Sequence, residues 1–258
     1  MRFITPEGNL SGPVPAGHDV LPCTLGGENI GMFLDPPPMC ITDVHCRALA
    51  LLKKGRVLVI YIDGLGYDLY RRAQLPLIRQ TFRCTAARSV FPPLTQPCMA
   101  SMLTGVMPDE HGIFTRRDHR PRVPSLMSVP GCVLIEADSA PLMLEHPPIL
   151  TVPEQGETTD AAVLRAALPL AAGNAPLLIV HFHGLDDEEH AVGDDEKRLA
   201  GKLRELDEAV CALCAAFAGT AILCADHGVH AEGGAGSHGC FDFRDMFVPY
   251  GEASLCRD

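Results

Sequence analysis

The chain is predicted to be an α/β protein, a three-layer αβα sandwich around a mostly parallel sheet. Three short apolar runs, Val57–Ile62, Leu177–Phe182 and 220–224, are typical of strands that are buried on both faces. Segments with helical spacing of apolar residues lie between these runs. Because strands and helices alternate along the chain, we expect a parallel sheet with helices covering both of its faces.

The predicted helices and one further strand are placed by apolar spacing and by turn residues. Gly55 marks the end of the first helix, and Pro92-Pro93 precedes the second. The predicted helices cover residues 43–54, 97–103, 160–172 and 195–217, and a short strand is expected at 132–135. Together these elements account for the parallel sheet and most of its covering layers.

The length of 258 residues fits one catalytic domain over 1–258. Residues 1–40 are rich in Pro and Gly and end in Pro36-Pro37-Pro38, so they are predicted to form an irregular N-terminal arm. The stretch 117–153 is loop-rich and is interpreted as a possible small cap. It is too short for a second large domain.

The composition restricts the classes of partner. The formal net charge of −11 disfavours binding to a nucleic acid duplex, and no apolar run of about 18 residues predicts a membrane span. Residues 1–17 lack the apolar core of a signal peptide, so we expect a cytoplasmic protein whose eleven cysteines are reduced. Local basic residues allow a small anionic substrate, and an acidic protein that handles phosphate usually needs metal ions for positive charge.

Aspartate and histidine residues follow each of the three predicted core strands. Asp63 follows the first strand, Asp186 and His190 follow the second, and Asp226 and His227 follow the third. In open parallel sheets ligands bind beyond the carboxyl ends of the strands. A mixture of Asp and His side chains at one such edge suits zinc or manganese.

Each fragment also has an ordinary structural explanation. Asp63-Gly64 alone is most often a turn, and His238 could be a loop histidine. His183 and His230 also lie near the expected edge and are assigned no ligand role. Thr95, at the mouth of a predicted helix, could be a helix cap or a group that meets an anion there. Together the fragments are stronger evidence for a metal site than any one of them alone, because they occur in order after strand-like segments.

The ordered set of motifs resembles the type I phosphodiesterase/nucleotide pyrophosphatase family of the alkaline phosphatase superfamily. The resemblance spans 57 to about 250. It is carried by Val59-Ile60-Tyr61-Ile62-Asp63-Gly64, Phe91-Pro92 through Thr95 to Leu103-Thr104-Gly105, Pro108, His111-Gly112-Ile113, Asp186-x-x-x-His190, Asp226-His227-Gly228 and His238-Gly239. It implies an alkaline-phosphatase-like fold with a minimal cap, and a metal-dependent hydrolase of phosphate esters.

The resemblance implies two divalent metal ions, with zinc expected and manganese as the alternative. Each metal would have three protein ligands and an open position, as catalytic zinc requires. The implied ligands are Asp186, His190 and His238 for one metal, and Asp63, Asp226 and His227 for the other. Thr95 would attack phosphorus beside the second metal, form a phosphothreonine intermediate, and be released by water.

Arg116 is the residue at which the sequence departs from the family pattern. By count it occupies the place of an Asn that holds a phosphate oxygen in the family. A guanidinium could bind phosphate through two hydrogen bonds and would favour a more anionic group. A structural alternative is a solvated loop residue near Asp118.

Several functions therefore remain open. Hydrolysis of phosphodiester or nucleotide pyrophosphate bonds is the leading interpretation, with a phosphomonoesterase as the main alternative because of Arg116. A mutase would need a larger cap, and a sulfatase would need a modified Cys or Ser where Thr95 stands. A non-catalytic metal-binding protein is disfavoured because the ligand set is complete.

Overall fold

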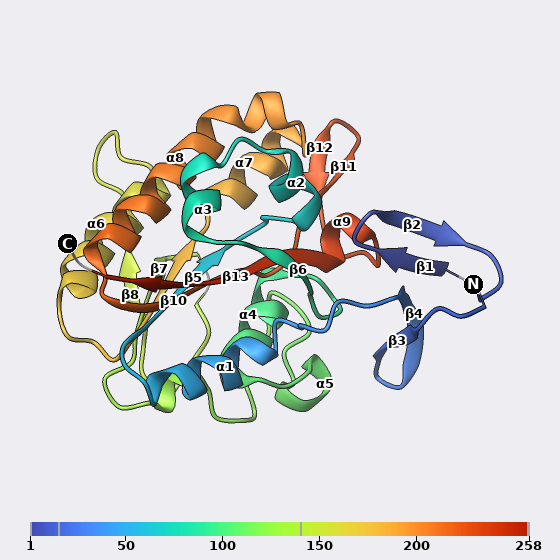
Figure 1. Cartoon of the computed structure of the whole chain (residues 1–258), viewed down its shortest axis with the longest axis horizontal. Coiled ribbons are helices and arrows are strands. Elements are labelled where there is room, and N and C mark those ends of the chain that lie inside the picture. Colours follow the sequence, from blue (N-terminus) through green and yellow to red (C-terminus); the bar gives the residue numbers. More distant parts are fainter. Residues whose placement is uncertain (1, 15, 140, 257–258) are drawn as a thin grey trace.

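A seven-stranded sheet forms the centre of the computed structural model, which describes residues 2–14, 16–139 and 141–256 (Figure 1). The strand order is β6-β13-β10-β5-β9-β7-β8. Their bounds are Val57–Ile62 for β5, Thr85–Arg88 for β6, Val133–Ala137 for β7, Ile149–Thr151 for β8, Leu177–Phe182 for β9, Gly219–Ala225 for β10 and Phe247–Leu255 for β13. The predicted core strands thus lie next to one another.

The register of the central strands aligns their carboxyl ends. β10, β5, β9, β7 and β8 pair in parallel, whereas β13 is antiparallel to both β10 and β6. Ile62, the last residue of β5, pairs with Phe182 of β9 and with Ala225 of β10. The residues that follow these three strands therefore emerge side by side at one edge.

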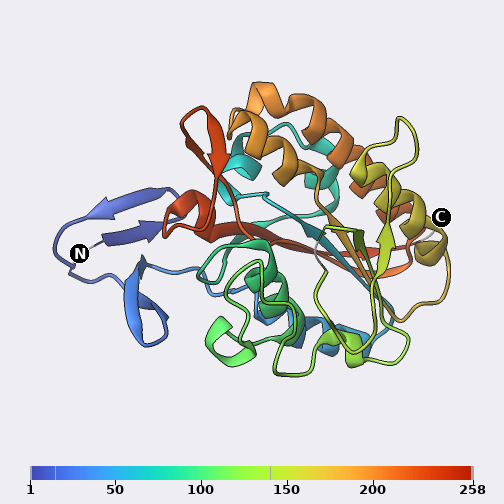
Figure 2. The same cartoon turned by 180° about the vertical axis from the view of Figure 1, so that it is seen from behind.

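Helices cover both faces of this sheet, as Figures 1 and 2 show. One layer contains α2 (Tyr67–Arg72), α3 (Pro76–Thr81), α6 (Thr159–Ala172), α7 (Gly184–Val192) and α8 (Glu196–Ala216). The other contains α1 (Asp43–Leu52), α4 (Thr95–Thr104) and α5 (Pro108–His111). The predicted α/β class with a mostly parallel sheet is confirmed. Within the described ranges, no helix is both long and apolar enough to cross a bilayer.

Burial explains why the central elements form where they do. Every residue of β5 and of β9 is buried, as expected for strands between two helical layers. In α4, all residues from Gln96 to Thr104 are buried as well. A helix enclosed on all sides needs no polar face. Its first residue, Thr95, is therefore held by a rigid, packed element.

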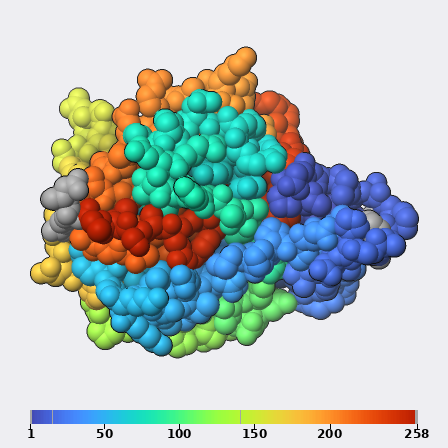
Figure 3. Space-filling model, viewed as in Figure 1, coloured from blue at the N-terminus to red at the C-terminus, as the bar shows by residue number. Residues whose placement is uncertain are grey.

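The N-terminal segment differs from the prediction of an irregular arm. It forms a four-stranded sheet in the order β2-β1-β4-β3, which projects from one end of the molecule (Figure 3). The strands are Arg2–Thr5, Gly8–Ser11, Val20–Leu25 and Glu28–Leu34, from β1 to β4. Gly26 and Gly27 both have positive φ in the β3–β4 turn, a Gly-Gly hairpin signal that the overall Pro and Gly content obscured. Residues 1 and 15 of the predicted arm lie outside the described residues.

Aromatic packing attaches this small sheet to the main body. The Phe33 ring on β4 contacts Phe241 and Phe247 edge-on, with centroid distances of 5.5 and 5.8 Å. Ile4, Cys23 and Met246 join the same buried cluster. Phe241 follows the predicted ligand His238 closely, so the small sheet supports the chain segment that carries that histidine.

The stretch 117–153 also differs from its interpretation as a cap. It contributes β7 and β8 to the central sheet, together with a short 3₁₀ helix at Leu126–Ser128. Strands of five and three residues between loops give only a weak sequence pattern. Residue 140 of this stretch, like 257–258 of the predicted domain, lies outside the described part of the chain.

Replacing Phe33 by Ala should destabilise the protein by about 3–5 kcal/mol, because it removes the ring that joins the small sheet to Phe241 and Phe247. Chemical denaturation would measure the change in the free energy of unfolding. Leu10→Ala, at an exposed position on β2, serves as the control and should change that free energy by less than about 0.5 kcal/mol. Equal stability of the Phe33 and Leu10 variants would contradict the proposed packing.

Candidate functional site

The ends of β5, β9 and β10 bring three predicted ligand-bearing segments together. Asp63 follows β5, and its backbone N–H donates to the carbonyl of Phe182 at 2.9 Å. The next residue, Gly64, has φ of 80°, and its N–H donates to Asp226 Oδ1 at 3.1 Å. A Cβ at Gly64 would lie 2.5 Å from Glu189 Oε2 and 3.1 Å from the Asp186 Cα. The glycine therefore allows the two segments to approach closely.

The second predicted ligand set is compact and buried. His227 Nε2 lies 3.4 Å from Asp63 Oδ1 and 3.3 Å from Asp226 Oδ2. All three side chains are almost completely excluded from solvent. The predicted grouping of Asp63, Asp226 and His227 is thus present as a cluster of facing donor atoms.

The residues of the first predicted set lie beside it, but the donor atoms that come within 4.8 Å of one another there are those of Asp186, His238 and His227 rather than His190. Asp186 and His190 are one turn apart on α7, and His190 Nε2 is 3.2 Å from Asp186 Oδ2. His238 follows the hairpin of β11 (His230–Glu232) and β12 (Ala235–Ser237), and its Nε2 is 3.8 Å from Asp186 Oδ1. The His227 and His238 rings stack at 3.9 Å, so the two sets form one continuous site.

Backbone carbonyls orient all three histidines in the same way. The Nδ1 atoms lie 3.3 Å from Gly236 O for His190, 3.2 Å from Gly228 O for His227 and 2.9 Å from Pro93 O for His238. A proton on each Nδ1 can then be donated to a carbonyl, which leaves each Nε2 as a lone-pair donor. This is the usual support for histidines that bind a metal.

The donor atoms fit divalent metal ions. Four buried atoms of the two sets have no hydrogen-bond partner among the described residues: Asp63 Oδ1, Asp186 Oδ1, Asp226 Oδ2 and His190 Nε2. Ligands of a tetrahedral zinc with bonds of about 2.0–2.1 Å are separated by roughly 3.3 Å. The N–O separations of 3.2–3.8 Å in both sets are close to this value.

The electrostatics of the metal-free site are unfavourable for the charged aspartates. Burial, with the neighbouring carboxylates, raises the pKa of Asp63 and of Asp226 well above the usual range. Burial also lowers the pKa of His227. At Asp186 burial opposes ionisation, but contact with His190 and the other histidines holds its pKa below the usual value. A bound cation would favour the ionised carboxylates, so metal binding should release protons.

Thr95 stands at the start of the ten-residue helix α4, facing this site. Its Oγ1 lies 3.5 Å from His227 Nε2. Thr95 lines a cavity of about 190 Å³ together with Asp63, Gln96, Arg116 and Asp186. Unsatisfied N–H groups at a helix start favour an anion, so a phosphoryl group in this cavity would meet the threonine hydroxyl and the helix end.

The Arg116 side chain reaches the same cavity from an exposed loop. Its Nη2 is 3.3 Å from His238 Nε2. The neighbouring Asp118 carboxylate accepts from the N–H groups of Phe114 and Thr115, which fixes the loop. Arg116 therefore borders the site, whereas Asp118 contacts the loop backbone.

Sequence reasoning assigned no role to His183, although its side chain lies inside the site. His183 Nδ1 is 3.0 Å from Asp63 Oδ2, and His181 Nε2 is 3.7 Å from the same oxygen. The buried carboxylate of Asp160 accepts from the N–H groups of His183 and Gly184 and so fixes the end of β9. His183 could have been found because it follows a core strand as Asp63 does, but Asp160 lies distant in sequence.

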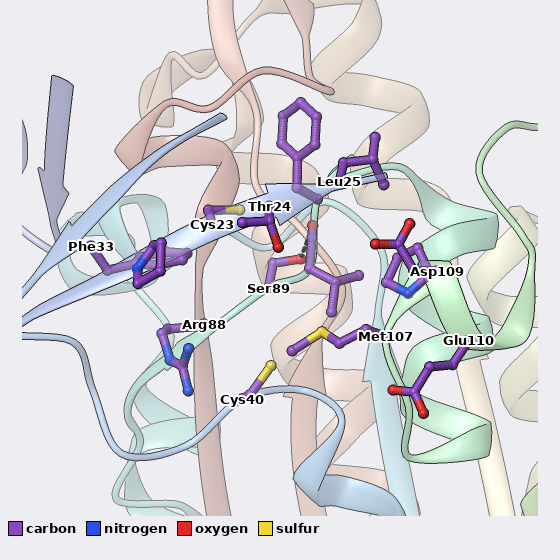
Figure 4. Close-up of a pocket in the computed structure, with 14 residues that line it drawn as sticks. Cys23, Thr24, Leu25, Phe33, Cys40, Arg88, Ser89, Met107, Asp109 and Glu110 are labelled. Carbon is purple, nitrogen blue, oxygen red and sulfur yellow. Dashed lines mark hydrogen bonds between the residues drawn. The ribbon is translucent and has the colours of Figure 1, made fainter. Parts of the chain in front are cut away.

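A separate cavity of about 250 Å³ lies between the small N-terminal sheet, the segment 88–91 and the start of α5 (Figure 4). Its lining is mostly apolar, with Arg88 above the Phe33 ring at 5.6 Å. Ser89, on its wall, donates a hydrogen bond to the backbone carbonyl of Asp226. None of the predicted site residues lines this cavity, so it is distinct from the candidate site.

Comparisons with known proteins identify a related family for part of the sequence and similar structures for the fold. A model of the family "type I phosphodiesterase / nucleotide pyrophosphatase" matches residues 57–125, which include Asp63, Thr95 and Arg116. No curated protein sequence matches the chain. Murine ectonucleotide pyrophosphatase/phosphodiesterase 5 is similar in structure, with a TM-score of 0.55 and 16% identity over 68% of this chain and 57% of that one.

Two further solved structures are similar. A 2-O GAG sulfatase has a TM-score of 0.59 and 14% identity over 78% of this chain and 64% of its own. An inactive threonine-to-alanine variant of the murine protein, in complex with AMP, has a TM-score of 0.51 and 16% identity, with the same coverage as the unmodified protein. The chain thus spans less than two thirds of these proteins.

The predicted resemblance to the type I phosphodiesterase/nucleotide pyrophosphatase family is confirmed by the family match over residues 57–125. The fold is that of the alkaline-phosphatase-like enzymes. At 14–16% identity, the structural neighbours indicate the fold of this chain but not its substrate.

Protein purified without chelator should contain close to two equivalents of a transition metal, because two sets of buried donors face each other. His190→Ala should lose about one equivalent, and elemental analysis would measure the loss. His146→Ala, outside both sets, is the control and should retain the full content. An undiminished metal content in a combined variant of Asp186, His190 and His238 would rule out the assignment of the first set.

Proposed function

We propose that the protein is a metal-dependent hydrolase of phosphate esters, with Thr95 as the nucleophile and phosphodiester or nucleotide pyrophosphate bonds as its targets. One observation carries the proposal: the Thr95 hydroxyl lies at a helix start, 3.5 Å from His227 Nε2, in a cavity bordered by the buried aspartates. The family match includes this threonine.

Two divalent metal ions are proposed as cofactors, zinc first and manganese as the alternative. Asp63, Asp226 and His227 would hold one of them, and Asp186, His190 and His238 would hold the other. When bound, such ions lower the pKa of a nearby hydroxyl and offset the charge of a phosphoryl group. The mixed Asp and His donor set is compatible with both metals.

The residues of the chain would then act in two steps. In the first, Thr95 Oγ1 forms a bond to phosphorus as the bond to the leaving oxygen breaks, which gives a phosphothreonine. In the second, water attacks the same phosphorus, the bond to Oγ1 breaks, and the threonine hydroxyl is restored. The start of α4 and the Arg116 guanidinium would bind the remaining phosphoryl oxygens.

The similar murine protein supports this assignment. It is an ectonucleotide pyrophosphatase/phosphodiesterase, and an inactive threonine-to-alanine variant of it forms a complex with AMP. By analogy, we propose a small anionic phosphate-containing substrate for this chain. A threonine nucleophile also disfavours a sulfatase, despite the likeness in fold to a 2-O GAG sulfatase.

A phosphomonoesterase is the second candidate, and Arg116 is the observation that favours it. A monoester carries up to two negative charges at its phosphoryl group, whereas a diester carries one. A guanidinium beside His238 therefore favours the monoester. A non-catalytic metal-binding protein would keep the metal sites without turnover.

Replacing Thr95 by Ala should reduce kcat by several orders of magnitude, because it removes the attacking oxygen. Metal content should stay largely unchanged, since six other side chains provide the donors. Thr95→Ser should retain part of the activity, as a primary hydroxyl can also attack. Assays with p-nitrophenyl phosphate and bis-p-nitrophenyl phosphate would measure these rates. Near-normal turnover of Thr95→Ala would show that the nucleophile lies elsewhere.

Replacing Arg116 by Asn should lower kcat/KM for a phosphomonoester by roughly 10- to 100-fold, because a charge-assisted hydrogen bond contributes about 1.5–3 kcal/mol. Activity on a diester should fall less, or rise. Arg117→Asn, at the exposed neighbouring position, is the matched control and should leave both rates unchanged. Unchanged rates for the Arg116 variant would remove this residue from the site, and equal losses would mean general positioning of phosphate.

A further inference from the structure

A second cavity, of about 290 Å³, lies beside the cavity that Thr95 lines, which we call the catalytic cavity. Ser139, His183 and Asp187 line both of them, so the two spaces are adjacent and share a wall. The second cavity extends away from Thr95 along Asp138 and the start of α6, where Thr159 lies. An ester bound at Thr95 could therefore place its organic group in this second cavity, which we call the side cavity.

The side cavity has an apolar wall, formed by Ala137, Val152 and Pro153, and a set of hydrogen-bond acceptors. The carboxylates of Asp138 and Asp187 line it and are exposed to solvent, and the hydroxyls of Ser139 and Thr159 lie beside them. The hydroxyl of Thr151 is already used, because it donates to the carbonyl of Glu136. Among the described residues that line the side cavity there is no Lys or Arg and no Phe or Tyr.

His183 adds a buried ring nitrogen at the junction of the two cavities. The residue is 8% exposed, and its Nδ1 lies 3.0 Å from the Asp63 carboxylate. The Asp63 carboxyl group thus occupies the Nδ1 side of the ring. His183 Nε2, on the other side, is buried and has no hydrogen-bond partner among the described residues. A ligand in the cavity can provide that partner.

We propose that the side cavity binds the organic group of a phosphate ester of an amino alcohol, with its ammonium group near Asp138 and Asp187. The inference rests on the proposed phosphoesterase function. An ammonium has three donors and a positive charge, which match two carboxylates and the free His183 nitrogen. Arg116 lies on the wall of the catalytic cavity, so the combined site matches a ligand with separated negative and positive ends.

Among the proposed targets, the same lining favours phosphodiesters of amino alcohols over nucleotide pyrophosphates. Bases bind well where an aromatic ring stacks on them, and no Phe or Tyr lines the described part of the side cavity. A neutral alkyl group would contact only the apolar wall and would gain nothing from the carboxylates. The cavity therefore discriminates among esters by their donors and charge.

Binding of two matched ligands tests the proposal. O-phosphoethanolamine and propyl phosphate have similar size and the same phosphate, but only the first carries an ammonium group. Metal-loaded Thr95→Ala protein should bind O-phosphoethanolamine about tenfold more tightly in calorimetry, as expected for a solvent-exposed charge-assisted contact of roughly 1.4 kcal/mol. Adenosine monophosphate should bind more weakly than O-phosphoethanolamine.

Asp187→Asn, combined with Thr95→Ala, should reduce the preference to less than about threefold. Glu188→Gln, at the next position of α7 and outside both cavities, is the matched control and should keep the full preference. Equal binding of the two phosphates, or no binding of either, would overturn the proposal. A clear preference combined with no hydrolysis of any phosphate ester by the unmodified protein would support the cavity assignment and overturn the hydrolase function.

Discussion

The burial of three carboxylates, those of Asp63, Asp186 and Asp226, is the constraint on which the rest of the site depends. Charged groups removed from water need opposite charge and hydrogen bonds nearby. Here Asp63 Oδ1 and Asp226 Oδ2 have no hydrogen-bond partner among the described residues, and each lies within 3.4 Å of His227 Nε2. A divalent cation satisfies such an arrangement, and the protein groups alone do not.

The surrounding structure holds these carboxylates and the histidines beside them in position. The aligned ends of β5 and β10 place Asp63 and Asp226 together, and Gly64 permits the close approach of α7. Carbonyls of Pro93, Gly228 and Gly236 fix the three histidines. Because these supports come from rigid elements, the donor atoms are positioned before any metal binds.

The central fold could be predicted from the sequence because its patterns are local, and the family resemblance then suggested which of the polar residues after the strands are candidate ligands. Continuous apolar runs marked β5 and β9 with their observed bounds, and each polar ligand follows a strand or lies one helical turn from another ligand. Parallel pairing then implies that the ligands meet, which the register of Ile62 with Phe182 and Ala225 explains.

Other features depend on contacts that are distant in sequence. The antiparallel β13 inserts between β6 and β10, and nothing in its own residues indicates this place. The small N-terminal sheet is stabilised by Phe33 against Phe241, over 200 positions away. The place of His183 in the site is recognised only from its 3.0 Å contact with Asp63. The role of Asp160 is recognised only from the hydrogen bonds that it accepts from N–H groups at the end of β9. Tertiary packing decides these features, so periodicity and spacing do not reveal them.

The central claim is that Thr95 takes up a phosphoryl group during turnover. Mass spectrometry of metal-loaded protein, quenched in acid during hydrolysis of bis-p-nitrophenyl phosphate, tests it most directly. The account predicts one phosphorylated site, located at Thr95 by peptide fragmentation, and none in protein stripped of metal. Phosphate on another residue, or turnover with no phosphorylated protein when Thr95→Ala remains active, would contradict it.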